Sequence, residues 1–202
     1  MKKHLKTNYT KAIVIVHGAS ERQIVANILS KLHLNIKVHS RDKGKTSILI
    51  SCLKNEFDRT YFKSKRKFAE KFGIQVEGSE PINFKLFIVM DNDNVDEKSL
   101  KEYKNKKMFK DHWLCDYIVP ILNNPNLEEV LYDVGLIDNK YKGKDKMRNY
   151  SSIFPISCNK LDVDAVEAVE AFSKTLRKTR KTNMYIFTEY CVSLVKDTLV
   201  NI

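Results

Sequence analysis

The sequence predicts an α/β fold in which a small parallel sheet is flanked by helices. The first observation is a set of short apolar runs rich in β-branched residues, of which residues 12–16 (Ala-Ile-Val-Ile-Val) are the clearest. Such continuous runs are typical of strands buried on both faces of a parallel sheet. The second observation is that segments with apolar residues at helical spacing follow these runs. Strands that alternate with helices in this way form a parallel sheet with helices on its faces.

Strands and helices are expected to alternate along the first part of the chain. A helix is predicted to begin at Ser20, which fits a capping box with Gln23 three residues later. Further helices are predicted over residues 46–72, with a break or bend near Tyr61 and a stop signal at Gly73, and over residues 127–132. The predicted strands cover residues 12–16, 34–39, 84–90 and 115–122.

The chain changes character after about residue 155. Residues 161–180 and 183–199 have two helical patterns with no strand signal between them. A chain of 202 residues fits one domain with a helical appendage. We therefore expect an α/β domain over residues 1–155 and a helical C-terminal segment over residues 156–202 that packs on it.

Composition and charge exclude several classes of protein. Hydrophobic residues make up 43% of the chain, which is enough for a core and excludes wholesale disorder. No apolar run approaches the ~18 residues of a membrane-spanning helix, and no secretory signal follows the basic N-terminus. We therefore expect a cytoplasmic protein with no membrane contact. The net charge of +11 lies in clusters such as residues 63–67 and 177–181, which are either solvated surface or a surface that meets phosphates.

Polar side chains follow the predicted strands at their carboxyl ends, where ligands collect in open parallel sheets. Carboxylates gathered there from separate loops would form a hard-oxygen site suited to Mg²⁺. Each carboxylate also has a structural explanation, because first-turn helix positions favour Glu and turns favour Asp. The candidates are His17 and Glu21 after the first strand, Asp91 and Asp93 after the third, and Glu128 and Glu129 after the fourth.

Two short motifs resemble the TOPRIM domain. Residues 13–21 (Ile-Val-Ile-Val-His-Gly-Ala-Ser-Glu) are similar to the strand that ends in Glu-Gly-x-x-Glu/Asp in that family, and residues 88–93 (Ile-Val-Met-Asp-Asn-Asp) to the strand that ends in Asp-x-Asp. The later Asn-Pro-x-Leu-Glu stretch and residues 144–150 are similar to the TOPRIM-like proteins of the OLD and RloB type, many linked to phage defence. The resemblance covers about residues 10–135 and departs from the family at His17, where the family has Glu.

The resemblance implies a metal-dependent phosphodiester hydrolase, or the nuclease-like part of a phage-defence system. The metal, Mg²⁺ or Mn²⁺, would polarise a phosphate oxygen and orient water for attack on phosphorus. Nucleic acid is the expected partner, and any ATPase or specificity subunit would be a separate chain. The implied metal ligands are Glu21, Asp91 and Asp93, with help from Glu128 or Glu129. The implied catalytic residues are His17 as acid–base group, Glu21, and Lys144, which would steady phosphate charge together with Lys43 and Lys45.

Two other interpretations stay open. In the first, His17 marks the loss of the site, because imidazole suits softer metals than Mg²⁺, and the chain is a catalytically inactive TOPRIM-like module that binds nucleic acid or a partner protein. In the second, the chain is a structural or regulatory protein whose lysines are solvated surface. Divalent-metal binding separates the enzyme from both, and salt-dependent nucleic-acid binding separates the module from the regulatory protein.

Overall fold

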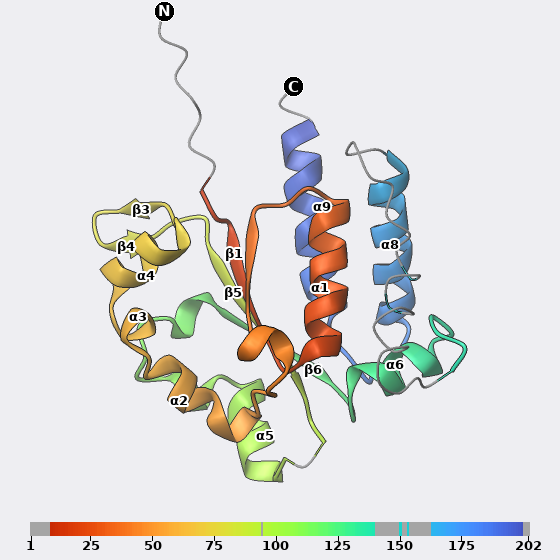
Figure 1. The fold of residues 1–202 in the computed structure, drawn as a ribbon, viewed down its shortest axis with the longest axis horizontal. Helices are drawn as coiled ribbons and strands as arrows, with labels where there is room; N and C mark the ends of the chain where they lie inside the picture. Colours follow the sequence, from red (N-terminus) through yellow and green to blue (C-terminus); the bar gives the residue numbers. More distant parts are fainter. Residues whose placement is uncertain (1–8, 94, 140–149, 151–152, 154–162, 200–202) are drawn as a thin grey trace, which may run out of the picture.

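The fold is an α/β fold built on a parallel sheet, as predicted. A computed structural model describes residues 9–93, 95–139, 150, 153 and 163–199 (Figure 1). Its four-stranded sheet has the order β2-β1-β5-β6, and every neighbouring pair is parallel. The strands are β1 (Ala12–Val16), β2 (Ile36–His39), β5 (Lys85–Asp91) and β6 (Ile118–Asn123).

The central strands are buried on both faces, which explains why they are continuous apolar runs. All five residues of β1 and six of the seven residues of β5 are buried. The predicted fourth strand begins later than expected, at Ile118, because Cys115–Tyr117 forms a 3₁₀ turn. In the register, Val16 pairs with Val89, and Asp91 pairs with Asn123. The carboxyl ends of β1, β5 and β6 therefore meet at one edge.

Helices cover both faces of the sheet, and β1 shows how the two layers divide. Its alternate side chains point to opposite faces, so Ala12, Val14 and Val16 join one core cluster and Ile13 and Ile15 join the other. The first cluster is completed by α1 (Ala19–Lys31), α6 (Leu127–Asp133), α8 (Val163–Arg177) and α9 (Tyr185–Leu199). The second is completed by α2 (Leu53–Phe57), α3 (Thr60–Lys63), α4 (Lys65–Phe72) and α5 (Glu97–Lys104).

Two local predictions were wrong. Helix α1 begins after Gly18, and the Glu21 carboxylate, rather than the Ser20–Gln23 pair, completes its capping box. The helix expected over residues 46–72 begins only after a 3₁₀ turn at Ile50–Cys52, and two breaks, where the backbone is extended at Arg59 and Ser64, replace the one break or bend expected near Tyr61. Three short helices result. These breaks let the aromatic side chains of the segment pack together beneath the sheet. The stop at Gly73 is confirmed, since Gly73 ends α4 in the left-handed conformation with φ of 65°.

The smaller elements connect these layers. A two-stranded hairpin of β3 (Val76–Glu77) and β4 (Glu80–Pro81) precedes β5. The 3₁₀ turns are η1 (Asp42–Gly44), η2 (Ile50–Cys52), η3 (Lys107–Phe109) and η4 (Cys115–Tyr117). The boundary predicted at residue 155 lies outside the described residues, so the division into two segments stays a prediction. Among the helices that the structure describes, none is long and apolar enough to cross a membrane.

The chain after α8 returns to the edge of the sheet. Strand β6 is an edge strand, and the Asn183 side chain bonds to it as another strand would. Asn183 Oδ1 accepts from the Leu122 N–H (2.7 Å), and Asn183 Nδ2 donates to the Pro120 carbonyl (2.9 Å). Thr182 forms an isolated bridge with Asn123. The turn between α8 and α9 therefore lies at the carboxyl end of β6 (Figure 1).

Candidate metal centre

A polar cavity of about 240 Å³ opens at the carboxyl ends of β1 and β5. This edge is where open α/β sheets bind ligands. Four acidic side chains reach the cavity from three different segments, together with one imidazole and several small polar groups. The lining residues are His17, Gly18, Ala19, Ser20, Glu21, Ser47, Asp91, Asp93, Asn126 and Glu128.

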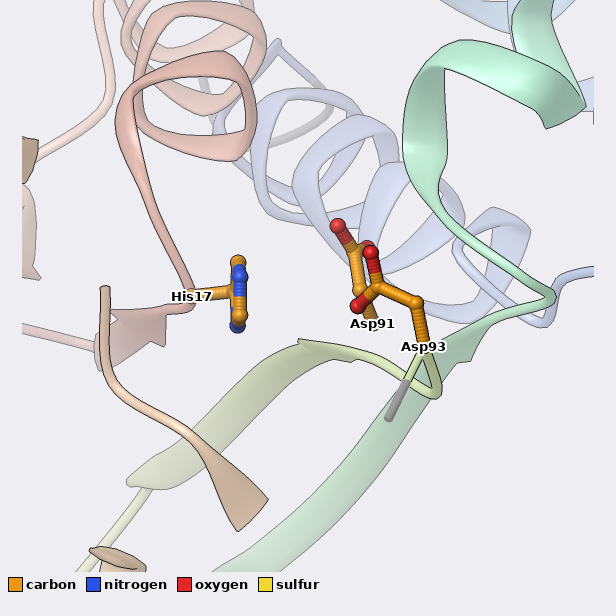
Figure 2. A group of neighbouring side chains, drawn as sticks. All are labelled: His17, Asp91 and Asp93. Carbon is orange, nitrogen blue, oxygen red and sulfur yellow. The ribbon is translucent and has the colours of Figure 1, made fainter. Parts of the chain in front are cut away.

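Three of these side chains form a possible metal-binding group. His17, Asp91 and Asp93 each offer one ligand atom, and these atoms all lie within 4.8 Å of one another. Figure 2 shows the two carboxylates opposite the imidazole ring. Ligands on opposite sides of one divalent ion are about 4 Å apart. Small side-chain rotations would therefore bring all three donors onto a single ion.

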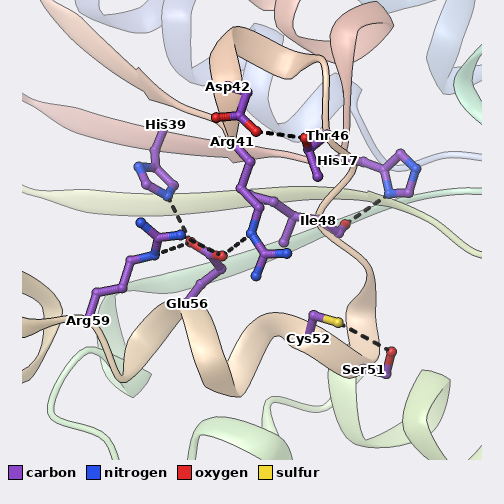
Figure 3. Close-up of polar contacts among 10 residues, drawn as sticks. All are labelled: His17, His39, Arg41, Asp42, Thr46, Ile48, Ser51, Cys52, Glu56 and Arg59. Carbon is purple, nitrogen blue, oxygen red and sulfur yellow. Dashed lines mark hydrogen bonds and ion pairs between the residues drawn. The ribbon is translucent and has the colours of Figure 1, made fainter.

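The position of His17 is fixed by the backbone on both sides. Its N–H donates to the Val89 carbonyl (2.9 Å), and its carbonyl accepts from the Ile48 N–H (2.8 Å). The ring Nδ1 lies 3.0 Å from the Ile48 carbonyl (Figure 3). Because a carbonyl only accepts, Nδ1 carries the proton in this contact, so that in the neutral ring Nε2 is the nitrogen that can bind a metal ion. Metal-binding histidines commonly have this arrangement, in which one ring nitrogen donates to a backbone carbonyl.

Asp91 is the most buried member of the group, with 7% of its surface exposed. Its Oδ1 accepts from Asn123 Nδ2 (3.0 Å) and from the Leu127 N–H (3.2 Å). Burial, followed by the negative charge of Glu21, raises the pKa of Asp91 to about 8, against the opposing effect of the Asn123 hydrogen bond. Without a cation nearby, Asp91 therefore carries a proton at neutral pH.

Glu21 lines the cavity but is not one of the three clustered ligands. Its side chain is buried, and Oε2 accepts from the Gly18 N–H (2.9 Å) at the start of α1. This contact has a structural role, because it satisfies a backbone donor at the first turn of the helix. Among the described residues, the group with close ligand atoms contains His17 where the sequence predicted Glu21.

The remaining predicted residues have different outcomes. Glu128 lines the cavity, whereas Glu129, one position further along α6, is not among its lining residues. Lys144 lies outside the described residues. Lys43 and Lys45 are exposed and do not line the cavity either.

The segment that carries these two lysines nevertheless approaches the site through its backbone. Gly44 has φ of 90°, and a Cβ built on it would lie 3.0 Å from the Ala19 Cα. A glycine is therefore needed for the close contact between the η1 turn and the start of α1. Ser47 lies three residues further along this segment and lines the cavity.

Two residues near the site were not predicted from the sequence. Asn123 is completely buried at the end of β6 and bonds to Asp91. The sequence could have indicated Asn123, because it ends the predicted strand next to the strand that ends in Asp91. Tyr150 is also buried, and its carbonyl accepts from Asn27 of α1 (3.1 Å). Tyr150 ends the stretch 144–150 that resembles the TOPRIM-like proteins, but the resemblance gave Tyr150 no role, and only the folded chain brings it to this edge.

The Tyr150 hydroxyl lies near the carboxylates of the acidic cavity. Burial raises the pKa of Tyr150 well above its ordinary value, and the neighbouring Ser20 opposes this rise. The nearby negative charges of Glu128, Glu21 and Asp91 raise it further. The hydroxyl therefore stays protonated, and it is buried with no hydrogen-bond partner among the described residues.

No protein-family model, no curated protein and no solved structure matches this chain. The similarity to the TOPRIM domain therefore stays a prediction from two short motifs. The case for a function rests on the geometry of the described residues.

Proposed function

We propose that the protein is a divalent-metal-dependent phosphodiester hydrolase that acts on nucleic acid. The observation that carries the proposal is the group of His17, Asp91 and Asp93, whose ligand atoms lie within 4.8 Å at the carboxyl edge of a parallel sheet. Two carboxylates and one imidazole form a donor set that suits a divalent cation. Glu21 and Glu128 add further negative charge to the same cavity. The net charge of +11 favours an anionic substrate for the protein as a whole.

The donor set favours Mn²⁺ over Mg²⁺. Mg²⁺ prefers oxygen ligands in a near-ideal octahedron, and His17 replaces one of these oxygens by nitrogen. A bound cation would supply the charge that polarises a phosphate oxygen. In this proposal Asp91, Asp93 and His17 hold the cation, and Asn123 keeps the Asp91 carboxylate oriented through its 3.0 Å hydrogen bond.

The contacts of His17 and Tyr150 define their parts in the proposal. The lone pair of His17 Nε2 serves the cation or accepts a proton, because Nδ1 is engaged by Ile48. The Tyr150 hydroxyl is a neutral, unsatisfied donor close enough to Glu128, Glu21 and Asp91 to be affected by their charges, and in this proposal it hydrogen-bonds an oxygen of the substrate. Lys144 keeps its predicted role of steadying phosphate charge. A TOPRIM-type origin, a place in phage defence and a separate ATPase or specificity subunit are proposed from the resemblance alone.

The proposal is tested by metal binding and cleavage measured on the same variants. Wild-type protein, Asp91→Asn and His17→Glu would be titrated with Mn²⁺ and Mg²⁺ by calorimetry, then incubated with single- and double-stranded DNA and RNA. We expect Mn²⁺-dependent cleavage by the wild type and a loss of ~100-fold or more in Asp91→Asn, since even indirect disturbance of a metal ligand costs about 10–100-fold. His17→Glu should shift the preference from Mn²⁺ towards Mg²⁺, because it replaces nitrogen by a hard anionic oxygen.

A catalytically inactive nucleic-acid-binding module is the second candidate. The observation in its favour is that the Glu21 carboxylate is bonded to the Gly18 N–H, while the first position of the family motif holds His17. If wild type, His17→Glu and Asp91→Asn are equally inactive with both metals on every substrate, the hydrolase proposal fails. Salt-dependent binding of nucleic acid would then support the module.

A further inference from the structure

A second polar site lies on the other side of the loop that borders the metal centre. This loop, residues 123–126, contributes Asn126 to the acidic cavity and Asn124 to a hollow of about 520 Å³ at the edge of β6. The cations of the second site come from α5 and from the turn between α8 and α9. They are Lys104, Arg177, Arg180 and Lys181, and we call this group the basic turn site. A neighbouring hollow of about 630 Å³ shares Arg180 and Lys181 and adds Lys178.

The basic turn site has more positive charge than its own carboxylates balance. Arg177 pairs with Glu189 through Nη2 (2.6 Å), and Lys181 pairs with Asp133 (2.5 Å). Among the residues that the structure describes, no ion pair is formed by Lys104, Lys178 or Arg180, and all three are exposed. An excess of exposed cations around a hollow attracts a polyanion more strongly than evenly scattered charge does.

The two sites are joined by one buried side chain. Asn123 Nδ2 donates to Asp91 Oδ1 of the metal centre (3.0 Å), and Asn123 Oδ1 accepts from Thr182 Oγ1 of the basic turn site (2.8 Å). The backbone is linked as well, because the Asn124 N–H donates to the Lys181 carbonyl (2.8 Å). The acidic and basic sites are therefore held close together at the same end of the sheet (Figure 1).

We propose that the basic turn site binds the phosphate backbone of the nucleic-acid strand on which the metal centre acts. This inference rests on the proposed function. A ligand that reaches both sites must repeat its negative charge at short intervals, and each strand of nucleic acid carries one phosphate per about 3.4 Å of helix axis. Phosphates at Lys104 and Arg180 would meet cations directly, while a neighbouring phosphate at the carboxylate-lined cavity would require the divalent cation there. The basic turn site thus supplies affinity and position along the strand, and the metal centre supplies the chemistry.

The test measures binding without metal, so that it does not depend on cleavage. Fluorescence anisotropy in EDTA would give the affinity of labelled single-stranded and duplex oligonucleotides over a range of salt concentrations. The variants are Arg180→Gln, Lys104→Gln and their combination. The matched control is Lys67→Gln, which removes one exposed positive charge from α4, away from the basic turn site. Each variant at the basic turn site should weaken binding and reduce the salt slope by about 1, while Lys67→Gln should match the wild type.

Three results would overturn the inference. One is wild-type protein that binds no oligonucleotide, and another is equal salt slopes for Arg180→Gln and Lys67→Gln. The third is displacement of the oligonucleotide by polyglutamate of equal total charge as readily as by unlabelled nucleic acid, which would assign the site to an acidic protein instead. Mn²⁺ titration of the same variants keeps the two proposals apart. If the wild type does not bind Mn²⁺ but Arg180→Gln weakens nucleic-acid binding, the hydrolase proposal fails and the basic turn site remains a nucleic-acid site. If the wild type binds Mn²⁺ but Arg180→Gln has no effect on nucleic-acid binding, the inference about the basic turn site fails and the hydrolase proposal remains.

Discussion

Two buried carboxylates, Glu56 and Asp91, have opposite surroundings in this protein. Glu56 lies in α2 with no exposed surface, and three cationic or ionisable groups converge on it (Figure 3). His39 Nε2 donates to it at 3.2 Å, and Arg59 (Nε to Oε2, 2.9 Å) and Arg41 form ion pairs with it. Asp91 lies at the end of β5 and faces carboxylates instead, with Glu21 and Asp93 nearby.

The pKa values of the two groups are displaced in opposite directions. Burial by itself would raise the pKa of Glu56, but hydrogen bonds from His39 and Arg41 and the charges of Arg41 and Arg59 bring it below its ordinary value. Burial raises the pKa of Asp91 to about 8, and the charge of Glu21 adds to that rise. Glu56 therefore stays ionised as part of the fold. Asp91 lacks an equivalent set of cations, which is the condition expected at a site that recruits a cation from solution.

The largest predicted effect on stability comes from neutralising Glu56, the carboxylate whose charge is balanced by cations. Glu56→Gln leaves Arg41, Arg59 and His39 around a neutral group, and removing one partner of a buried ion pair is strongly destabilising. We expect a loss of about 3 kcal/mol in the free energy of unfolding, measured by urea denaturation. The control is Glu70→Gln, which breaks an exposed pair with Arg66 on α4 and should leave the urea midpoint nearly unchanged. Equal effects of the two substitutions would show that the Glu56 network does not stabilise the fold.

A somewhat smaller effect on stability is expected when Mn²⁺ binds at Asp91, the carboxylate without balancing cations. Mn²⁺ at 100 times its dissociation constant should stabilise the wild type by about 2.7 kcal/mol, because it binds only the folded protein. For a chain of this size, each kcal/mol of stabilisation raises the Tm by ~2–4 °C. Asp91→Asn should not be stabilised by Mn²⁺. Glu56→Gln should still be stabilised by Mn²⁺, because Glu56 is not a proposed ligand. Equal Mn²⁺ stabilisation of wild type and Asp91→Asn would contradict the assignment of Asp91 as a ligand.

The smallest predicted effect concerns pH in the absence of metal. Folded Asp91 has a pKa of about 8 against an ordinary value of 3.8, so between these values the folded state binds a proton that the unfolded state has released. Raising the pH from 7 to 8 in EDTA should therefore destabilise the wild type relative to Asp91→Asn, which does not titrate. We expect a relative change of about 1 kcal/mol in urea unfolding. Parallel stability curves for the two proteins would mean that Asp91 does not titrate in this window.

The sequence predicted the parts of the fold that depend on local pattern. The strands β1 and β5 were recognisable because strands buried on both faces are continuous apolar runs. The sequence also indicated that His17, Glu21, Asp91 and Asp93 share one edge, since parallel strands share their carboxyl edge, but it named Glu21 rather than His17 as the ligand beside the two aspartates.

Other parts depend on contacts that no local pattern encodes. The cap of α1 involves Glu21 rather than Ser20, and the two possibilities have equally acceptable sequence signals. The breaks before α3 and α4 accompany the packing of Phe57 against Phe109 and of Phe68 against Trp113, which joins residues far apart in the chain. The approach of Tyr150 to α1 joins residues 123 positions apart along the chain.

The Asn183 side chain also has a consequence for self-association. An edge strand with open N–H and carbonyl groups is a template on which a strand of another molecule can add. In β6, Pro120 has no N–H to offer, and the Pro120 carbonyl and Leu122 N–H are already bonded to the amide of Asn183. One side-chain amide thus imitates a peptide group of a fifth strand and ends the growth of the sheet. Because Asn183 lies two residues before α9, displacement of that helix would uncover this edge and make it prone to intermolecular strand pairing.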